Sequence, residues 1–93
     1  MTPAPIAKTF VVRGRVQGVG FRYFVERTAQ AMALRGYVRN LDNGDVEVYA
    51  IGTSAQLSEL AGRLWQGPRF AEVRGVEEKE GVVRLIDDFR IER

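Results

Sequence analysis

The 93-residue sequence predicts one α+β domain in which two helices pack on one face of a mainly antiparallel sheet. Two segments place apolar residues at the spacing of an amphipathic helix, and the segments around them are short and rich in β-branched and aromatic residues. Along the chain they follow the order β-α-β-β-α-β. That order is typical of the ferredoxin-like sandwich, a fold that hosts many activities and names no function by itself.

The first strand and the first helix follow a short tail. Residues 1–6 contain two prolines, so we expect a loose N-terminal tail there and a single domain over residues 7–93. A strand is expected from Lys8 to Gly14, because its centre is a β-branched and aromatic run. A helix is expected from Phe21 to Arg35, with Gly36 where helices commonly end. Its apolar face consists of Phe21, Phe24, Val25, Thr28, Ala29 and Met32.

A hairpin is expected next. Strands over residues 37–41 and 45–51 flank the pair Asn43-Gly44, which tolerates the positive φ of a tight turn. In the second strand apolar and polar residues alternate, which indicates one buried face and places Tyr49 on the other. We nevertheless expect Tyr49 to be a packing residue.

The second helix is expected to begin at Thr53 or Ser54 and to end near Gln66, just before a Gly-Pro pair. A fourth strand is expected over residues 71–79 and a short closing strand over residues 89–91. The apolar face of this helix consists of Leu57, Leu60, Ala61, Leu64 and Trp65.

The residue types exclude several classes of chemistry. The chain has no cysteine and no histidine, so it offers no disulfide, no thiolate nucleophile, no imidazole base and no imidazole metal ligand. We therefore expect no cofactor and no metal site, and we expect Asp87-Asp88 to be an acidic turn. No apolar run reaches the roughly 18 residues of a membrane helix. We expect a monomer in the cytoplasm that binds neither a membrane nor a nucleic acid.

The charge is unevenly distributed along the chain. Residues 1–40 carry seven basic side chains and one acidic one, a net charge of +6. Residues 41–93 carry seven basic and eleven acidic side chains, a net charge of −4. This asymmetry suggests that the first part of the chain faces an anion, and a solvated basic surface without such a partner is the alternative.

The segment from Gly14 to Arg22 carries the strongest functional pattern. Three glycines lie within seven residues and lead directly into the first expected helix. Glycines let backbone N–H groups turn inward, and a helix N-terminus has unpartnered N–H groups and a positive dipole end. We therefore expect a phosphate site. The segment lacks the Gly-Lys-Ser/Thr ending of a Walker loop and the glycine spacing of a dinucleotide-binding fold.

Arg22 is at an unusual position for a cation, because the first turn of a helix favours acidic side chains. An anion held between the loop and the guanidinium, with its planar set of donors, would explain this position. The alternative is a surface ion pair between Arg22 and Glu26, one helical turn further on.

Two segments resemble the motifs of the acylphosphatase family. Residues 14–22, GRVQGVGFR, are similar to the family's phosphate loop, and residues 36–47, GYVRNLDNGDVE, are similar to its second motif. The two occur in the family's order and at about its separation, and the resemblance extends from Lys8 to the C-terminus. It implies metal-independent hydrolysis of a small acyl phosphate to a carboxylate and inorganic phosphate.

The resemblance also implies the roles of individual residues. Arg22 would bind the phosphate and Asn40 would orient the attacking water, and a phosphate or sulfate ion could occupy the same site. The rest of the phosphate cradle would be the backbone N–H groups of Arg15, Val16, Gln17, Gly18, Val19, Gly20 and Phe21.

The chemistry of the residues agrees with this substrate class. An acyl phosphate loses a carboxylate, whose acid has a pKa of about 4, so the leaving group needs no proton from an imidazole. The amide of Asn40 can hydrogen-bond a water and aim it at phosphorus, but it could instead bond its own backbone at the end of a strand. Arg39 is expected on the opposite sheet face, and Arg15 adds positive potential or is simply solvated.

Two other classes of function remain open. Small β-α-β-β-α-β domains include RNA-binding modules, but the third expected strand has two acids and one aromatic residue where such modules carry stacking aromatics. A non-catalytic accessory domain that keeps an anion site is the other alternative.

Overall fold

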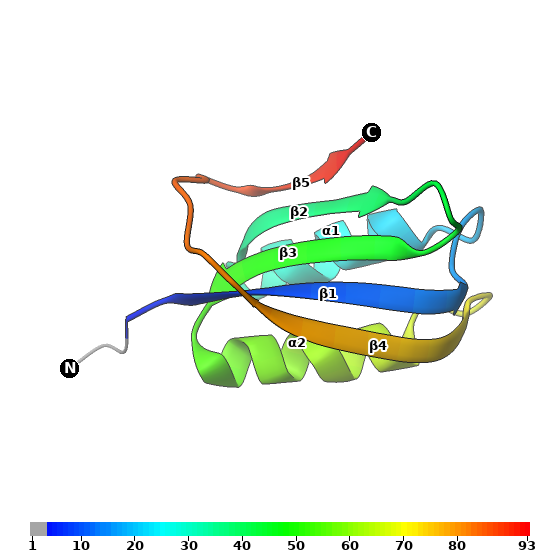
Figure 1. Ribbon diagram of the computed structural model, residues 1–93, viewed down its shortest axis with the longest axis horizontal. Helices are drawn as coiled ribbons and strands as arrows, with labels where there is room; N and C mark the ends of the chain where they lie inside the picture. The colour runs from blue at the N-terminus through cyan, green and yellow to red at the C-terminus, as the bar shows by residue number, and fades with distance from the viewer. Residues whose placement is uncertain (1–3) are drawn as a thin grey trace.

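A computed structural model describes residues 4–93, which form a five-stranded sheet with two helices on one face (Figure 1). The strand order across the sheet is β4-β1-β3-β2-β5. The predicted ferredoxin-like architecture is therefore confirmed, and the expected closing strand forms as β5 beside β2. The elements are β1 (Ile6–Arg15), α1 (Phe21–Ala31), β2 (Arg35–Asn40), β3 (Val46–Gly52), α2 (Ser54–Gln66), β4 (Glu72–Gly81) and β5 (Phe89–Glu92).

Strand β1 pairs antiparallel with both β3 and β4, and β3, at the centre of the sheet, also pairs antiparallel with β2. The closing strand β5 pairs with β2 in parallel. Ile6 already pairs with Gly52, so the sheet includes the last residue of the expected tail, whereas residues 1–3 of that tail lie outside the described part. The core fills the space between the sheet and the helices, and its bulkiest members are Phe10, Phe21, Phe89, Leu57, Leu60 and Leu64.

The first helix ends earlier than the sequence predicted. α1 stops at Ala31, and the chain turns at Ala33, whose φ of 57° is in the left-handed region. The N–H of Ala33 donates to the carbonyl of Gln30, and the N–H of Leu34 donates to that of Ala29, which is the Schellman pattern. Burial of Leu34 in the core explains the early stop, because the chain must turn inward there.

Gly36 is a strand residue and not the end of the helix. It lies in β2 with φ of 144°, and a Cβ on it would lie 1.8 Å from the carbonyl oxygen of Tyr49 in β3. A glycine is therefore required here by the close approach of two strands.

The prediction that Trp65 packs in the core was wrong. Its side chain is 51% exposed, whereas the other four residues of the predicted apolar face are buried. Eight residues at 100° each place Trp65 about 80° around the helix from Leu57, at the margin of the buried stripe. The start of α2 is as expected, since Thr53 forms a capping box with Gln56.

Tyr49 is buried on the face of the sheet that the helices leave open. Residues 82–88 cross this face, where the Tyr49 hydroxyl donates to the carbonyl of Val82 and accepts from the N–H of Arg84. The Arg84 guanidinium lies 4.9 Å from the ring centroid, and the Tyr37 ring stacks on it with the centroids 5.3 Å apart. The packing role is confirmed, and Tyr49 offers no free ring for stacking a nucleic-acid base.

Candidate active site

The loop between β1 and α1 presents an uncapped helix N-terminus. Gly18 and Gly20 have φ values of 74° and 78°, in the left-handed region that favours glycine. Gly20 is the N-cap residue, so it has no side chain to accept from the first N–H groups, and the first turn of α1 contains no acid. A Cβ on either glycine would meet no atom within 4 Å, so the space in front of the loop is open. These features together suit an anion.

A cavity of about 200 Å³ lies against this loop. It brings together the beginning of α1, which carries Arg22, and the end of β2, which carries Asn40. Its lining is completed by Val16, Gly18, Gly20, Tyr23, Ile91 and Arg93. The two residues expected to be catalytic thus face one space, as do three of the loop residues expected in the phosphate cradle.

The guanidinium of Arg22 has no hydrogen-bond or ion-pair partner within residues 4–93. The alternative pairing with Glu26 is not formed, because an oxygen of Glu26 accepts from the backbone N–H of Ile91 at 3.2 Å. Glu26 therefore fastens α1 to β5, and the charge of Arg22 remains available to a ligand in the cavity.

Asn40 has a buried side-chain oxygen without a partner. Its Oδ1 is enclosed, yet no described donor lies within hydrogen-bond distance. Leaving a buried acceptor unpaired costs about 1–3 kcal/mol, so a folded chain keeps such a group only where something else is gained. The expected alternative, in which this side chain bonds its own backbone, is absent from residues 4–93. The amide is available to a small polar molecule.

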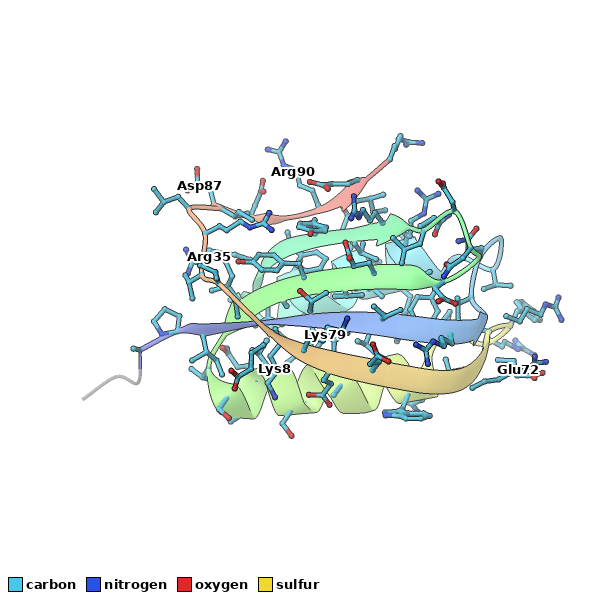
Figure 2. The ribbon with its side chains drawn as sticks, viewed as in Figure 1. Lys8, Arg35, Glu72, Lys79, Asp87 and Arg90 are labelled. Atoms are coloured by element: carbon cyan, nitrogen blue, oxygen red, sulfur yellow. The ribbon has the colours of Figure 1, made fainter. Side chains whose placement is uncertain are left out.

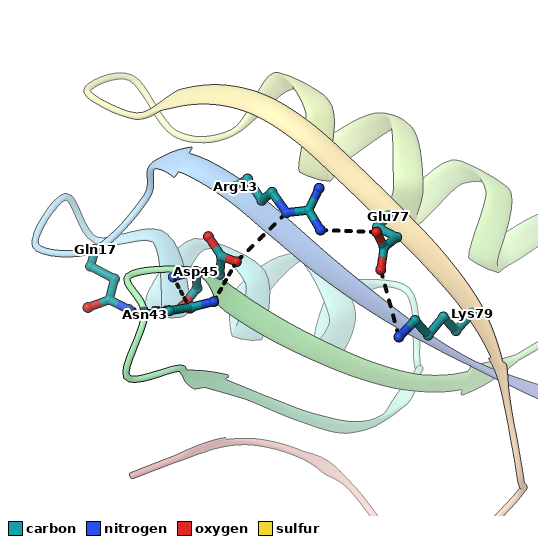
Figure 3. A network of polar contacts seen from close by, with 6 residues as sticks. All are labelled: Arg13, Gln17, Asn43, Asp45, Glu77 and Lys79. Atoms are coloured by element: carbon teal, nitrogen blue, oxygen red, sulfur yellow. Dashed lines mark hydrogen bonds and ion pairs between the residues drawn. The ribbon is translucent and has the colours of Figure 1, made fainter.

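Gln17 has a role that the sequence did not reveal. Its side-chain Nε2 donates to the carbonyl of Leu41 at 2.9 Å. It also donates to the carbonyl of Asp45 at 2.9 Å, a residue that Figure 3 draws beside it. Asn40 immediately precedes this hairpin, so one amide side chain ties the glycine loop to the strand end that carries Asn40. Its position within a glycine-rich motif had suggested only a backbone contribution.

A network of charged side chains links the hairpin between β2 and β3 to neighbouring strands on the outer face of the sheet. Asp45 accepts from the side chain of Asn43 at 3.1 Å and lies 3.8 Å from Arg13 of β1 (Figure 3). Arg13 also pairs with Glu77 of β4 at 3.0 Å, and Glu77 lies 3.8 Å from Lys79. The hairpin is thereby linked to two other strands.

The remaining candidates lie outside the cavity. Arg15 is exposed at the end of β1, and the Val19, Gln17 and Phe21 side chains do not line the cavity. Arg39 lies on the outer face as predicted, where Glu47 binds it at 2.7 Å and raises the pKa of its guanidinium.

The acidic pair near the C-terminus lies at the β5 edge. Asp88 binds Arg90 at 2.8 Å, and Figure 2 shows Asp87 and Arg90 at that edge. Residues 4–93 contain no group of three side chains that could hold a metal ion. In the same range no helix has the length and apolar character needed to cross a membrane.

Three residues that line the cavity were missed by the sequence argument. Tyr23 lies on the exposed side of α1, while Ile91 and Arg93 reach the cavity only because β5 pairs with β2. No local pattern marks the last two, since their position depends on a parallel pairing between distant segments.

Comparison with known proteins agrees with the geometry. The family model described as acylphosphatase matches residues 8–91. An acylphosphatase of Solibacter usitatus is 56% identical over 91% of this chain and 88% of its own length. The crystal structure of an acylphosphatase from Bacillus subtilis has a TM-score of 0.91 at 35% identity, covering 95% of this chain and 99% of that one. A Coxiella burnetii acylphosphatase structure has a TM-score of 0.91 at 39% identity and covers 96% and 94%. The chain belongs to the acylphosphatase family.

Proposed function

We propose that this acylphosphatase uses Arg22 and the N–H groups of residues 15–21 to hold the phosphoryl group of an acyl phosphate, while Asn40 positions the attacking water. The observation that carries the proposal is a coincidence of unpaired groups. Arg22, whose guanidinium has no partner, and Asn40, whose buried amide oxygen has no partner, line one cavity at an uncapped helix N-terminus.

The proposed reaction needs mainly positioning and charge stabilisation. The water oxygen forms a bond to phosphorus as the bond from phosphorus to the acyl oxygen breaks, and the carboxylate leaves with the electron pair. Charge on the equatorial phosphoryl oxygens increases or spreads in this transition state, and fixed donors lower its energy. Arg22 supplies a planar pair of donors and the loop supplies backbone N–H groups.

The amide of Asn40 has a different role in this proposal. Its oxygen accepts a hydrogen bond from the water and holds the water in line with the bond that breaks. A carboxamide is not a base, so the proton passes to a phosphoryl oxygen of the substrate. Inorganic phosphate or sulfate would occupy the same cavity and compete with the substrate. We further propose that the enzyme acts as a monomer in the cytoplasm, which size-exclusion chromatography and cell fractionation would test.

The decisive experiment measures phosphate release from benzoyl phosphate in excess chelator for the wild type and for the variants Arg22→Ala and Arg22→Lys. We expect fast turnover by the wild type and a loss of at least about 100-fold in kcat/KM for both variants, because a lysine keeps the charge but loses the paired donors. Arg74→Ala is the matched control. This arginine is exposed on β4 and paired with Glu72, so its removal should change turnover less than about twofold.

Each outcome leads to a different conclusion about the phosphate site. Near-normal turnover by Arg22→Ala would contradict the proposed phosphate site, and full activity of Arg22→Lys would show that charge alone suffices. A folded wild type without turnover would favour an accessory domain that only binds anions.

A further inference from the structure

A second groove adjoins the phosphate cavity. It has a volume of about 440 Å³ and runs along α1 toward the last turn of α2. Gly20 and Tyr23 line both spaces, so the groove opens directly beside the loop that would hold the phosphoryl group. The groove is therefore adjacent to the substrate, and the established activity leaves it without a role.

Two arginines from different helices line this groove. Arg27 of α1 and Arg63 of α2 form no ion pair with any carboxylate within residues 4–93, and no acidic side chain lines the groove. Tyr23, Phe24 and Pro68 provide an apolar wall between the arginines and the loop. An apolar path that ends at two cations fits a short carbon chain with an acidic group at its end.

The position of Arg27 brings its charge close to the loop. Side chains on a helix lean toward its N-terminus, here toward the phosphate cavity. The guanidinium of Arg27 accordingly lies 5.4 Å from the ring centroid of Tyr23, one turn nearer the loop. Arg63 lies in the last turn of α2, where a cation also favours the helix dipole, so its variant requires a stability control.

The in-line geometry points the leaving group toward this groove. In the proposed function the water is held at Asn40, on the side of the cavity formed by β2 and β5. The leaving oxygen must lie on the opposite side of phosphorus. Gly20 and Tyr23, from the loop and from α1, are the two residues that the cavity shares with the groove, so a leaving group directed toward this part of the lining enters the groove.

We infer that the groove is the acyl-group subsite, and that Tyr23, Arg27 and Arg63 favour acyl phosphates whose acyl chain ends in a carboxylate. This inference rests on the proposed function, because it takes the phosphoryl group to be bound at Arg22 with the water at Asn40. The phosphate side of the site recognises every acyl phosphate alike, and the two arginines would select among them.

The test compares two substrates of equal chain length. Butanoyl phosphate ends in a methyl group, whereas the mono-phosphoric anhydride of butanedioic acid ends in a carboxylate. Steady-state kinetics of both substrates are measured for the wild type, Arg27→Gln, Arg63→Gln and the double variant. The control is Lys79→Gln, which also removes one positive charge but lies on β4, on the face away from the helices (Figure 2).

We expect the wild type to prefer the dianionic substrate. The double variant should lose about tenfold in kcat/KM for that substrate through a higher KM, the size of effect expected from two partly exposed charge-assisted hydrogen bonds. Its kcat/KM for butanoyl phosphate, its inhibition constant for inorganic phosphate and its thermal midpoint should stay close to those of the wild type. Lys79→Gln should leave the ratio between the two substrates unchanged.

Three results would overturn the inference, and a fourth concerns the proposed function. Equal kcat/KM of the wild type on both substrates would contradict the subsite. An equal loss on both substrates in the double variant, or the same loss in Lys79→Gln, would show only a general effect of charge. Turnover of neither substrate by folded wild type would instead refute the proposed function itself.

Discussion

Asn40 combines two properties that are rarely found together in a stable fold, since its amide oxygen is buried and has no partner within residues 4–93. The free energy lost there is recovered only when a molecule in the cavity donates a hydrogen bond. Arg22 is a parallel case, because a cation at the first turn of α1 opposes the helix dipole until an anion binds. In the proposed function both residues are therefore less favourable in the empty protein than in the complex with substrate.

Substitution of Asn40 separates orientation of the water from binding of the phosphate. We expect Asn40→Ala to lower kcat on benzoyl phosphate by about 100-fold, because the water loses its fixed position. The inhibition constant of inorganic phosphate should change less than about threefold. Protein stability should not fall, because the unpaired buried acceptor is removed and no hydrogen bond is lost. A parallel loss of phosphate affinity would assign Asn40 to binding.

For single residues, the sequence was informative where a residue type departs from the usual preference of its position. The glycines and the misplaced cation at Arg22 identified the loop, and the family motif added Asn40. The role of the Gln17 side chain could not be inferred, because its two acceptors are carbonyls in a hairpin that only the folded sheet brings near. Trp65 was misplaced because the helical period alone does not define how wide the buried stripe is.

Among the elements, the glycine loop is joined to the β2–β3 hairpin by two hydrogen bonds of the Gln17 side chain. We expect Gln17→Ala to lower kcat/KM by about tenfold, because the loop and the strand end that carries Asn40 lose their direct connection. Stability should fall by only about 1–2 kcal/mol, the usual contribution of such hydrogen bonds.

The matched control is Gln30→Ala. Gln30 donates from its side chain to the carbonyl of Phe89 at 3.1 Å, at the other end of α1. Its loss should lower stability without a comparable effect on kcat/KM. If the two variants reduce kcat/KM to the same extent, Gln17 has no special role in the site.

The end of α1 carries a non-glycine residue in a conformation that favours glycine. Ala33 has φ of 57°, so Ala33→Gly should raise the free energy of unfolding by about 0.5–1 kcal/mol, measured by urea denaturation. Ala31→Gly is the matched control, because the same exchange within the helix should lower stability by about 0.5–1 kcal/mol. A loss of stability in both variants would contradict the conformational free-energy cost assigned to the positive φ of Ala33.

The order of the elements could be predicted, but their ends could not. Local sequence patterns predicted both helices and all five strands, since burial of one face imposes a regular spacing and strands favour β-branched and aromatic residues. The boundary near Arg35 was wrong because Gly36, which suggested the end of a helix, is required instead by the close approach of β3.

For the whole molecule, ligand binding and stability should be coupled. A ligand that binds only the folded chain stabilises it by about 2.7 kcal/mol at a concentration of 100 Kd. We expect inorganic phosphate to raise the thermal midpoint of the wild type and of Asn40→Ala, but not of Arg22→Ala. An equal rise in Arg22→Ala would show that phosphate acts elsewhere on the chain or through the solvent.

For the whole molecule, the topology could be predicted, but the segments that cover its outer face and its β2 edge could not. The order β-α-β-β-α-β implied the stacked helices and the antiparallel core of the sheet. Local patterns could not show that residues 82–88 cross the open face above Tyr49, or that β5 pairs with β2 in parallel. Both depend on the path of the chain over elements that are distant in sequence.

Strand β1 is synthesised early, but one of its two partners, β4, is synthesised late. Arg15, at the start of the phosphate loop, lies opposite Glu72, and Ala7 lies opposite Gly81. Pairings across such long stretches of chain fold slowly, in milliseconds to seconds for topologies rich in them. A chain that ends after β3 therefore already contains the glycine loop, Arg22 and Asn40, but it lacks β4, the strand that pairs with β1 from Ala7 to Arg15.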